Sequence, residues 1–238
     1  MNTDILAIGA HPDDIELGCG GTIASCVKQG LNVSILDLTL GELGTRGNAK
    51  IRTEEAKNAS KILGVKSRIN LKLPDGNIEV NKKNIYKVIS IIRSLRPKIL
   101  IIPHFLERHP DHEHTHTIAK EAWFYSGLEK IKTSLNGKDQ IAYRPKKYFH
   151  FMQKYEFEPS FIFDISDVFD IKMKAIKAFA SQFYNPNSKE KETLLSNKEF
   201  LEFIEARDRN FGSMIYTKYG EAFYSFENVK INNILNLI

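Results

Sequence analysis

Short apolar runs that alternate with helical patterns limit this chain to an α/β architecture. Residues 5–8 form such a run and are bounded by Gly9, and residues 31–38 repeat the pattern after a glycine-containing helical stretch that ends at Gly30. Because a strand, helix, strand unit crosses over with a right hand, the two strands are expected to be parallel and to end at the same edge of a sheet. The pattern predicts a Rossmann-like, mostly parallel sheet flanked by helices.

The same alternation continues to about residue 125, after which a less regular segment, two strands and two helices are expected. Asn81 is expected to cap one of the later helices, and Pro97 to stop it. No internal repeat or linker interrupts the pattern, so a single domain covering residues 1–238 is expected. The predicted helices are 51–63, 85–95, 115–125, 168–179 and 200–211, and the predicted strands are 69–73, 99–102, 148–152 and 161–163.

Composition narrows the classes of partner and location. The 238 residues are 42% hydrophobic and 26% charged, as in ordinary globular domains. The net charge of +5 comes from Lys and Arg scattered among acidic residues, which predicts no nucleic-acid partner but favours an anionic small substrate. Cys19 and Cys26 are expected to be reduced, and no cleavable leader or membrane-spanning run is expected, so the sequence predicts a cytoplasmic protein without a membrane partner.

Two similar polar clusters each follow a predicted strand. They are Ala10-His11-Pro12-Asp13-Asp14 and His109-Pro110-Asp111-His112. One such cluster alone would be read as a turn with a helix cap, but two copies at strand ends of a parallel sheet predict a shared site at one edge. Two histidines and an aspartate are ligands that hold a catalytic zinc ion with a coordination position left open. Spacing alone leaves His104, His114 and His116 as further candidate ligands.

Other readings of these residues are weaker. Gly18, Gly20 and Gly21 are compatible with a non-catalytic nucleotide-binding module, but the acidic loop before them would repel a pyrophosphate, and close helix packing explains them better. Two histidines and a carboxylate also occur in non-haem iron oxygenases, whose jelly-roll strand pattern is not seen here.

Both clusters occur intact in the zinc-dependent N-deacetylases of the LmbE or PIG-L family, which this sequence resembles along nearly its whole length. Several further segments of this sequence resemble the bacillithiol-biosynthesis branch of the family. That resemblance implies N-acetylglucosaminyl malate as the substrate, with a chitooligosaccharide or another N-acetylglucosamine conjugate as the alternative. The segments that carry this similarity are Asp37-Leu38-Thr39, Gly41-Glu42-Leu43-Gly44-Thr45-Arg46-Gly47, Arg52-Thr53-Glu54-Glu55-Ala56, Leu73-Pro74-Asp75-Gly76, Ser181-Gln182-Phe183 and Tyr219-Gly220-Glu221-Ala222-Phe223.

The resemblance implies a role for each residue of the two clusters. It implies an amidohydrolase that acts on a linear amide, with Zn²⁺, or Fe²⁺ as the alternative, and a homo-oligomeric assembly. Its metal ligands would be His11, Asp14 and His112. Asp13 would be the general base, and His109 a second catalytic residue that Asp111 orients.

The proton path and the substrate contacts remain open at this point. Either Asp13 or His109 could protonate the leaving amine, and Asp111 could merely cap a helix. Arg52 is expected to anchor a substrate carboxylate, because a guanidinium can hold one with two hydrogen bonds, and Arg46 in the polar loop before it is expected to bind the substrate as well. The alternative for Arg52 is an exposed helix charge paired with Glu55.

Overall fold

The observed strands and helices follow the expected alternation. The computed structural model describes residues 3–237, and this alternation holds from residue 5 to residue 126. Beyond it, several strands and then two helices follow one another. The elements are β1 Ile5–Gly9, α1 Asp14–Lys28, β2 Val33–Thr39, α2 Ala49–Leu63, β3 Ser67–Leu73, α3 Lys82–Leu95, β4 Ile99–Pro103, α4 Pro110–Ser126, β5 Ser134–Leu135, β6 Lys138–Asp139, β7 Lys147–Phe151, β8 Phe161–Asp164, α5 Phe169–Lys177, α6 Lys198–Met214 and β9 Gly220–Tyr224, with short 3-10 helices at Ser166–Val168 and Ile234–Leu237.

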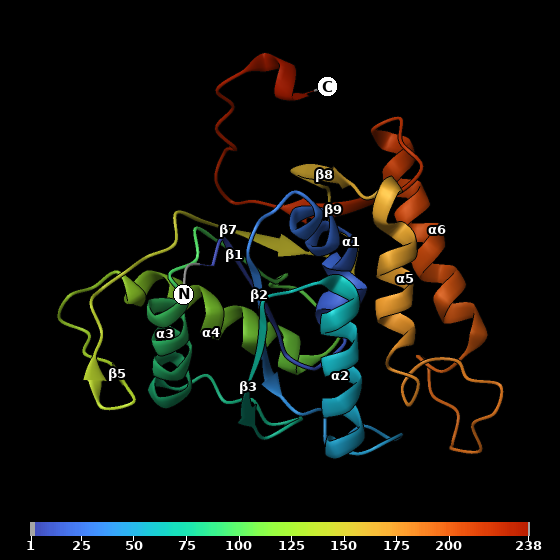
Figure 1. Ribbon diagram of the computed structural model, residues 1–238, viewed down its shortest axis with the longest axis horizontal. Coiled ribbons are helices and arrows are strands. Elements are labelled where there is room, and N and C mark those ends of the chain that lie inside the picture. Colours follow the sequence, from blue (N-terminus) through green and yellow to red (C-terminus); the bar gives the residue numbers. More distant parts are fainter. Residues whose placement is uncertain (1–2, 238) are drawn as a thin grey trace.

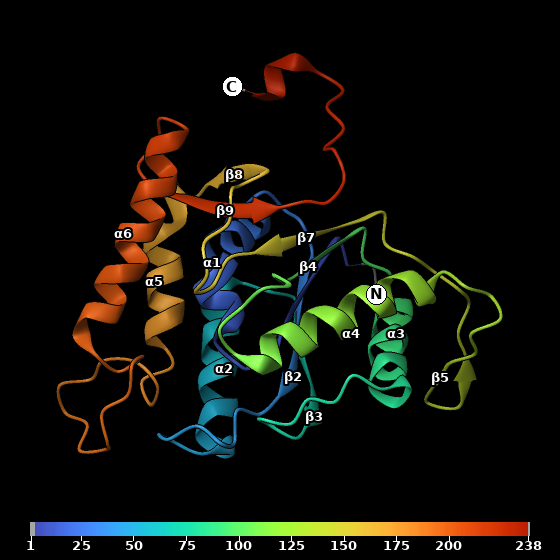
Figure 2. The same cartoon turned by 180° about the vertical axis from the view of Figure 1, so that it is seen from behind.

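A seven-stranded sheet forms the centre of the molecule, in the order β3, β2, β1, β4, β7, β9, β8 (Figures 1 and 2). The first five strands in this order are parallel, and β9 runs antiparallel to both β7 and β8. The expected single α/β domain with a mostly parallel sheet is thus confirmed. Strand β9 and the small hairpin β5–β6 were not among the expected elements.

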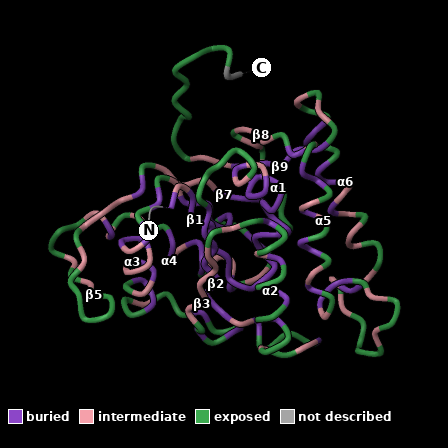
Figure 3. The backbone as a smooth tube through the Cα atoms, in the orientation of Figure 1, coloured by how far each residue is buried: buried purple, intermediate pink, exposed green. Residues whose placement is uncertain are grey.

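Helices cover both faces of the sheet, as Figures 1 and 2 show. Helices α1, α2, α5 and α6 contribute to the apolar core on one face, and α3 and α4 to the core on the other. Strand β1 serves both cores, because Ile5 and Ala7 face the first while Leu6 and Ile8 face the second. This explains why its sequence is continuously apolar. The buried residues accordingly gather along the sheet and the inner helix faces in Figure 3.

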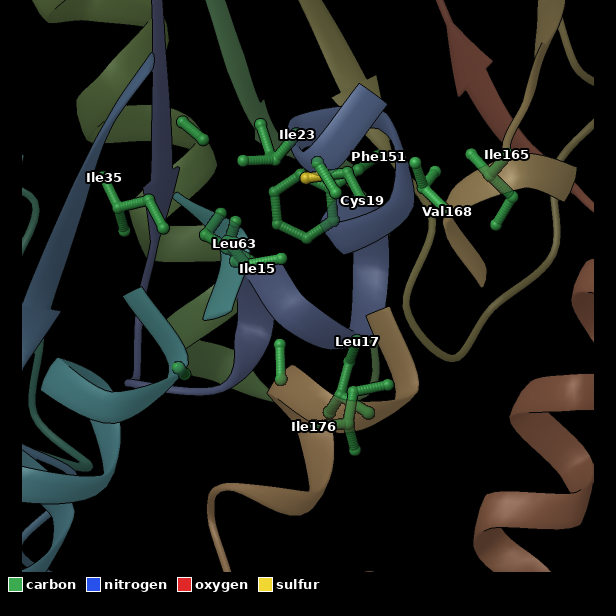
Figure 4. Close-up of a cluster of buried hydrophobic side chains, with 14 of the residues drawn as sticks. Ile15, Leu17, Cys19, Ile23, Ile35, Leu63, Phe151, Ile165, Val168 and Ile176 are labelled. Atoms are coloured by element: carbon green, nitrogen blue, oxygen red, sulfur yellow. The ribbon is translucent and has the colours of Figure 1, made fainter. Parts of the chain in front are cut away.

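Helix α1 packs unusually close to its neighbours. A Cβ atom on Gly18 would overlap the ring of Phe151, and one on Gly21 would lie 2.8 Å from Ile165, which confirms close packing as the reason for these glycines. Figure 4 shows Phe151 and Ile165 beside α1 in the first core. Cys19 and Cys26 of this helix are both free and buried, as expected.

A buried carboxylate joins α1 to the last strand. Helix α1 is kinked at Cys19, and the side chain of Glu221 in β9 accepts hydrogen bonds from the backbone N–H groups of Gly21 and Thr22, where the second half of the helix begins. Lys172 of α5 lies 2.8 Å from the same carboxylate. Glu221 therefore ties the kinked helix to the antiparallel part of the sheet.

Helix boundaries differ most from expectation at α4. This helix begins at Pro110 instead of residue 115, so the second cluster forms its first turn. Proline is favoured in that position because the first helical N–H groups have no partner within the helix. The side chain of Asn81 caps α3, as predicted, by accepting from the backbone N–H of Asn84. Within residues 3–237, no helix is long and apolar enough to cross a membrane.

Candidate metal centre and substrate pocket

The two polar clusters meet at the carboxyl edge of the sheet. The first follows β1 and the second follows β4, and these two strands are neighbours in the sheet. Strand β1 also pairs with β2 on its other side, so the chain reverses its winding direction between β1 and β4. In open α/β sheets, such a switch point leaves a crevice beyond the strand ends that suits ligand binding.

Asp14 lies between two imidazoles. Its carboxylate is 3.7 Å from Nδ1 of His11 and 3.2 Å from Nε2 of His112. The three side chains offer ligand atoms that all lie within 4.8 Å of one another, and Asp14 is 3% exposed. This is the set that the resemblance implied as metal ligands, and the structure brings it together.

The carboxylate of Asp14 is held firmly in this position. Its Oδ2 accepts hydrogen bonds from the backbone N–H groups of Ala10 and His11, each at 2.9 Å, and its Oδ1 accepts one at 2.8 Å from the side chain of Gln153. Burial alone would raise the pKa of Asp14, but the charge of His112 and the hydrogen bonds to both imidazoles hold it well below its usual value. Asp14 is therefore an ionised carboxylate at a fixed place.

Two carboxylates fix the orientation of His11. Its Nε2 lies 3.0 Å from Oδ1 of Asp75 and 3.3 Å from Oδ2 of Asp111. Because carboxylates only accept hydrogen bonds, Nε2 carries the ring proton, and Nδ1 is left free to bind a cation. Burial would lower the pKa of His11, yet hydrogen bonds to Asp111, Asp14 and Asp75 raise it well above its usual value. The carboxylates around His11 thus favour a positive charge at this place, which a divalent metal ion on Nδ1 of the neutral ring would supply instead of a second ring proton, and the donor set fits such an ion.

Asp111 does not orient His109 in the way that the resemblance implied. Its side chain contacts His11 and accepts from the backbone N–H groups of Gly76 at 2.8 Å and Ile78 at 3.3 Å. No hydrogen bond joins the Asp111 and His109 side chains within residues 3–237. The link runs the other way, since the backbone N–H of Asp111 donates to Nδ1 of His109, which caps α4. His11, His109 and Asp111 form a second group of suitable ligands, but Asp111 is already committed to these donors.

Asp13 sits beside the ligand set in a strained conformation. Its φ of 120° is rare for a residue with a side chain, and such strain is concentrated at functional sites. Burial raises the pKa of Asp13 to about 7, against the opposing charge of Arg52 and with the help of the neighbouring Asp14. A carboxyl group with a pKa near neutrality can both accept and return a proton.

Arg52 is a buried partner of Asp13. It is 4% exposed, its Nη2 donates to Oδ2 of Asp13 at 2.9 Å and to the carbonyl of Pro12, and its Nη1 donates to the carbonyl of Gly41 at 3.2 Å. The alternative of an exposed charge paired with Glu55 is therefore wrong. Contact between Arg52 and substrate remains a prediction.

A cavity of about 440 Å³ opens over these groups. Besides Arg52, three basic residues line it, Arg46, Arg108 and Lys154, together with an apolar wall. This wall comes from the end of the loop after α5 and from α6, and consists of Leu194, Leu195, Phe200, Phe203 and Ile204. The cavity is large enough for a small organic substrate and combines polar groups with an apolar surface.

The three extra histidines are not part of the ligand set. His104 packs against Phe105 and Phe157, with ring centroids 4.0 and 4.6 Å away. His116 is buried and hydrogen-bonds to the carbonyl of Pro103, and His114 is exposed.

Two residues of the site were not among the site residues expected from the sequence, Asp75 and Gln153. Each stands two positions past the end of a strand, β3 and β7 respectively. This position just past the end of a strand was the sequence feature that could have identified both residues as part of the site.

Comparisons with known proteins agree with this geometry. The family model for PIG-L, described as GlcNAc-PI de-N-acetylase, matches residues 6–123. The diacetylchitobiose deacetylase of Thermococcus kodakarensis is 32% identical over 191 residues, which cover 75% of this chain and 70% of that protein. The Bacillus cereus protein named "Probable N-acetyl-alpha-D-glucosaminyl L-malate deacetylase 2" is 26% identical over 196 residues, covering 76% and 84%. The crystal structure of a conserved protein from Thermus thermophilus matches with a TM-score of 0.86 at 34% identity, covering 96% of this chain and 97% of that one.

Proposed function

This chain belongs to the PIG-L (LmbE) family, and from that membership we propose that it is a metal-dependent hydrolase that removes the acetyl group from an N-acetylglucosaminide. The observation that carries the proposal is the position of Asp14 between His11 and His112, with Asp13 beside them in the same cavity. This arrangement supports a reaction centre with three metal ligands and a separate proton acceptor.

Zn²⁺ is the proposed metal, with Fe²⁺ as the alternative. His11, Asp14 and His112 would hold it through two imidazole nitrogens and a carboxylate, a set that leaves a coordination position open in catalytic zinc sites. When bound, the ion would polarise the acetamide carbonyl and acidify the attacking water.

Asp13 is the proposed general base and general acid. Its carboxylate takes a proton from the water that attacks the acetamide carbon, and it returns that proton to the amine nitrogen as the C–N bond breaks. Acetate and a free amine are the products. The pKa of about 7 suits both transfers, and the hydrogen bond from Arg52 keeps the carboxylate oriented.

His109 is proposed to stabilise the developing oxyanion as a neutral imidazole. Burial, followed by the charges of His11 and His112, lowers the pKa of His109. Because its Nδ1 accepts the backbone N–H of Asp111, the ring proton is on Nε2, and His109 lines the cavity. A neutral N–H donor directed at the carbonyl oxygen would stabilise the charge that develops there.

N-acetylglucosaminyl malate is the proposed substrate, with diacetylchitobiose as the alternative. The basic residues that line the cavity support an anionic substrate. The 32% identity to a diacetylchitobiose deacetylase supports the neutral sugar. Arg46 and Arg52 remain the proposed substrate-binding residues.

The proposal includes a cytoplasmic homo-oligomer that binds no nucleic acid. The two free, buried cysteines support a reducing compartment. Support for self-association comes from the projecting C-terminal segment after β9 in Figure 1, where four aliphatic side chains are exposed. They are Val229, Ile231, Ile234 and Leu235.

The test is release of free amine from a panel of N-acetylglucosaminyl compounds, including the malate glycoside and diacetylchitobiose. We expect one acetate for each amine, loss of activity with a chelator, and recovery with Zn²⁺ or Fe²⁺. Asp13→Asn should retain metal but lose most turnover, while Asp167→Asn, an exposed aspartate, serves as the matched control. Absence of amine release from every compound by the metal-loaded protein would contradict the proposed function.

A further inference from the structure

Arg46 is a buried cation at the wall of the cavity with an incomplete set of partners. Arg46 is 4% exposed, and its Nη2 donates a hydrogen bond to the hydroxyl of Ser188 at 2.5 Å. Its Nε has no hydrogen-bond partner in the part of the chain that the structure describes, although Oε2 of Glu190 lies 3.5 Å away. A guanidinium out of water requires an anionic partner with good geometry, and this one lacks it.

Glu190 approaches Arg46 from the solvent side. Its side chain is 49% exposed, and its Oε1 accepts a hydrogen bond at 3.0 Å from the backbone N–H of Gly47, next to Arg46. Ser188 supports the same contact, since its hydroxyl accepts the backbone N–H of Glu190 at 3.3 Å. The pair is thus asymmetric, with a cation fixed inside the protein and an anion on an exposed loop.

The loop that carries Glu190 also borders the substrate cavity. Thr193 and Leu194 of residues 185–196 line it together with Arg46. The loop is anchored by buried residues at its two ends, Phe183 and Ser196, whereas residues 189–192 between them are exposed. Glu190 can therefore leave Arg46 without disturbing a packed core.

Arg46 differs in this respect from Arg52. Both terminal nitrogens of Arg52 are engaged, Nη2 with the buried carboxylate of Asp13 and the carbonyl of Pro12, and Nη1 with the carbonyl of Gly41. Its charge is therefore matched within the site, although its Nε, like that of Arg46, has no hydrogen-bond partner in the described residues. The backbone of Arg46 is fixed as well, because its carbonyl accepts a hydrogen bond at 2.8 Å from Gln182. Its guanidinium is the buried cation of the cavity that still lacks a well-matched anion.

We propose that Arg46 is the binding site for a carboxylate on the aglycone of the acetylated sugar, and that Glu190 occupies this position until substrate displaces it. The inference rests on the proposed function and deepens it by naming the substrate class, an N-acetyl sugar whose aglycone carries a carboxylate. A substrate carboxylate can take two hydrogen bonds from the guanidinium, which Glu190 does not.

The test compares an anionic and a neutral substrate in matched variants. In Glu190→Gln, a competing charge is removed, so the KM for N-acetylglucosaminyl malate should fall several-fold relative to the KM for diacetylchitobiose. In Arg46→Gln, the KM for the malate glycoside should rise about tenfold or more, as expected for loss of a charged hydrogen bond, with a much smaller change for the neutral sugar. Glu192→Gln removes the same charge from an exposed position of the same loop and should match the wild type.

Calorimetric binding of the malate glycoside separates this inference from the proposed function. Its Kd should fall in Glu190→Gln and rise in Arg46→Gln whether or not the sugar is hydrolysed. The assignment of the carboxylate site to Arg46 would be overturned if the variants changed the KM for both substrates equally. It would also be overturned if Glu192→Gln had the same effect as Glu190→Gln. Glu190→Gln is an exposed substitution, so it keeps the test decisive if Arg46→Gln fails to fold. Failure of the proposed function would be seen separately, as binding without amine release.

Discussion

Replacement of His150 by Phe should make the folded protein less sensitive to acid. His150 is fully buried in β7, its Nδ1 hydrogen-bonds to the carbonyl of Tyr224, and its Nε2 has no partner within residues 3–237. The rings of His116 and His104 lie 5.1 and 5.8 Å away. Burial, followed by the charge of His116, lowers the pKa of His150 to about 3, and burial lowers that of His116 to about 4.

The size of the effect follows from these two pKa values. The unfolded chain takes up a proton on each imidazole below pH 6.5, whereas the folded protein keeps both neutral until about pH 4. Each histidine therefore stabilises the fold fully above pH 6.5, and this contribution falls as the pH drops from 6.5 toward the folded pKa. At pH 5 the loss is about 2 kcal/mol for each histidine. The total free energy of unfolding of a typical domain is only about 5–15 kcal/mol.

The assay is urea unfolding of metal-free wild type and His150→Phe between about pH 7.5 and about pH 5. We expect the free energy of unfolding of the variant to fall by about 2 kcal/mol less than that of the wild type over this range. Titration of carboxylates is common to both proteins and cancels in the difference. His114→Asn removes an exposed imidazole of α4 and should leave the pH dependence unchanged. Identical pH dependence in wild type and His150→Phe would refute the reasoning.

Three further substitutions test the site and its support. Asp111→Asn should weaken metal binding about tenfold to a hundredfold in a calorimetric titration, because the carboxylate of Asp111 orients the imidazole of His11, a proposed ligand. Arg52→Gln should move the acidic limb of the kcat/KM profile to higher pH, since the charge of Arg52 lowers the pKa of Asp13. Gly18→Ala should destabilise the fold by about 1–3 kcal/mol in urea unfolding, because a methyl group would overlap the ring of Phe151.

Much of the parallel part of the fold could be predicted because β1 and β4 are continuously apolar and helical patterns separate the first four strands. Strand β9 could not, since it begins with Gly220 and Glu221, which are poor strand formers in isolation. The fold accommodates Glu221 through its ion pair with Lys172 and through the backbone N–H groups and the Thr22 hydroxyl of α1, which are distant in sequence. Because these partners are distant in sequence, the residues around Glu221 do not indicate that its charge is paired in the fold.

The sequence indicated which residues of the candidate metal site lie close together, but it did not indicate how their side chains pair. Asp111 is two residues from His109, yet its carboxylate turns to His11 because the first turn of α4 faces β1 and the turn after β3. Arg52 was expected to bind the substrate, with an exposed helix charge as the alternative, yet its side chain reaches back to Asp13 and to the carbonyl of Gly41. Sequence spacing indicates which residues reach an edge of a sheet, while the direction of each side chain depends on packing around it.

The same edge argument, applied to every parallel strand, accounts for the parts of the site that the two clusters do not supply. His11, Asp75 and Gln153 each stand two positions past the end of a strand, β1, β3 and β7. Asp75 holds the imidazole of His11, and Gln153 donates to Asp14. Parallel strands deliver their ends to a common edge, so a polar residue at this offset reaches the ligands even when it belongs to no recognisable motif. The candidate metal site is therefore built by the sheet edge as a whole, with the two clusters supplying the proposed ligands and the other strand ends fixing them.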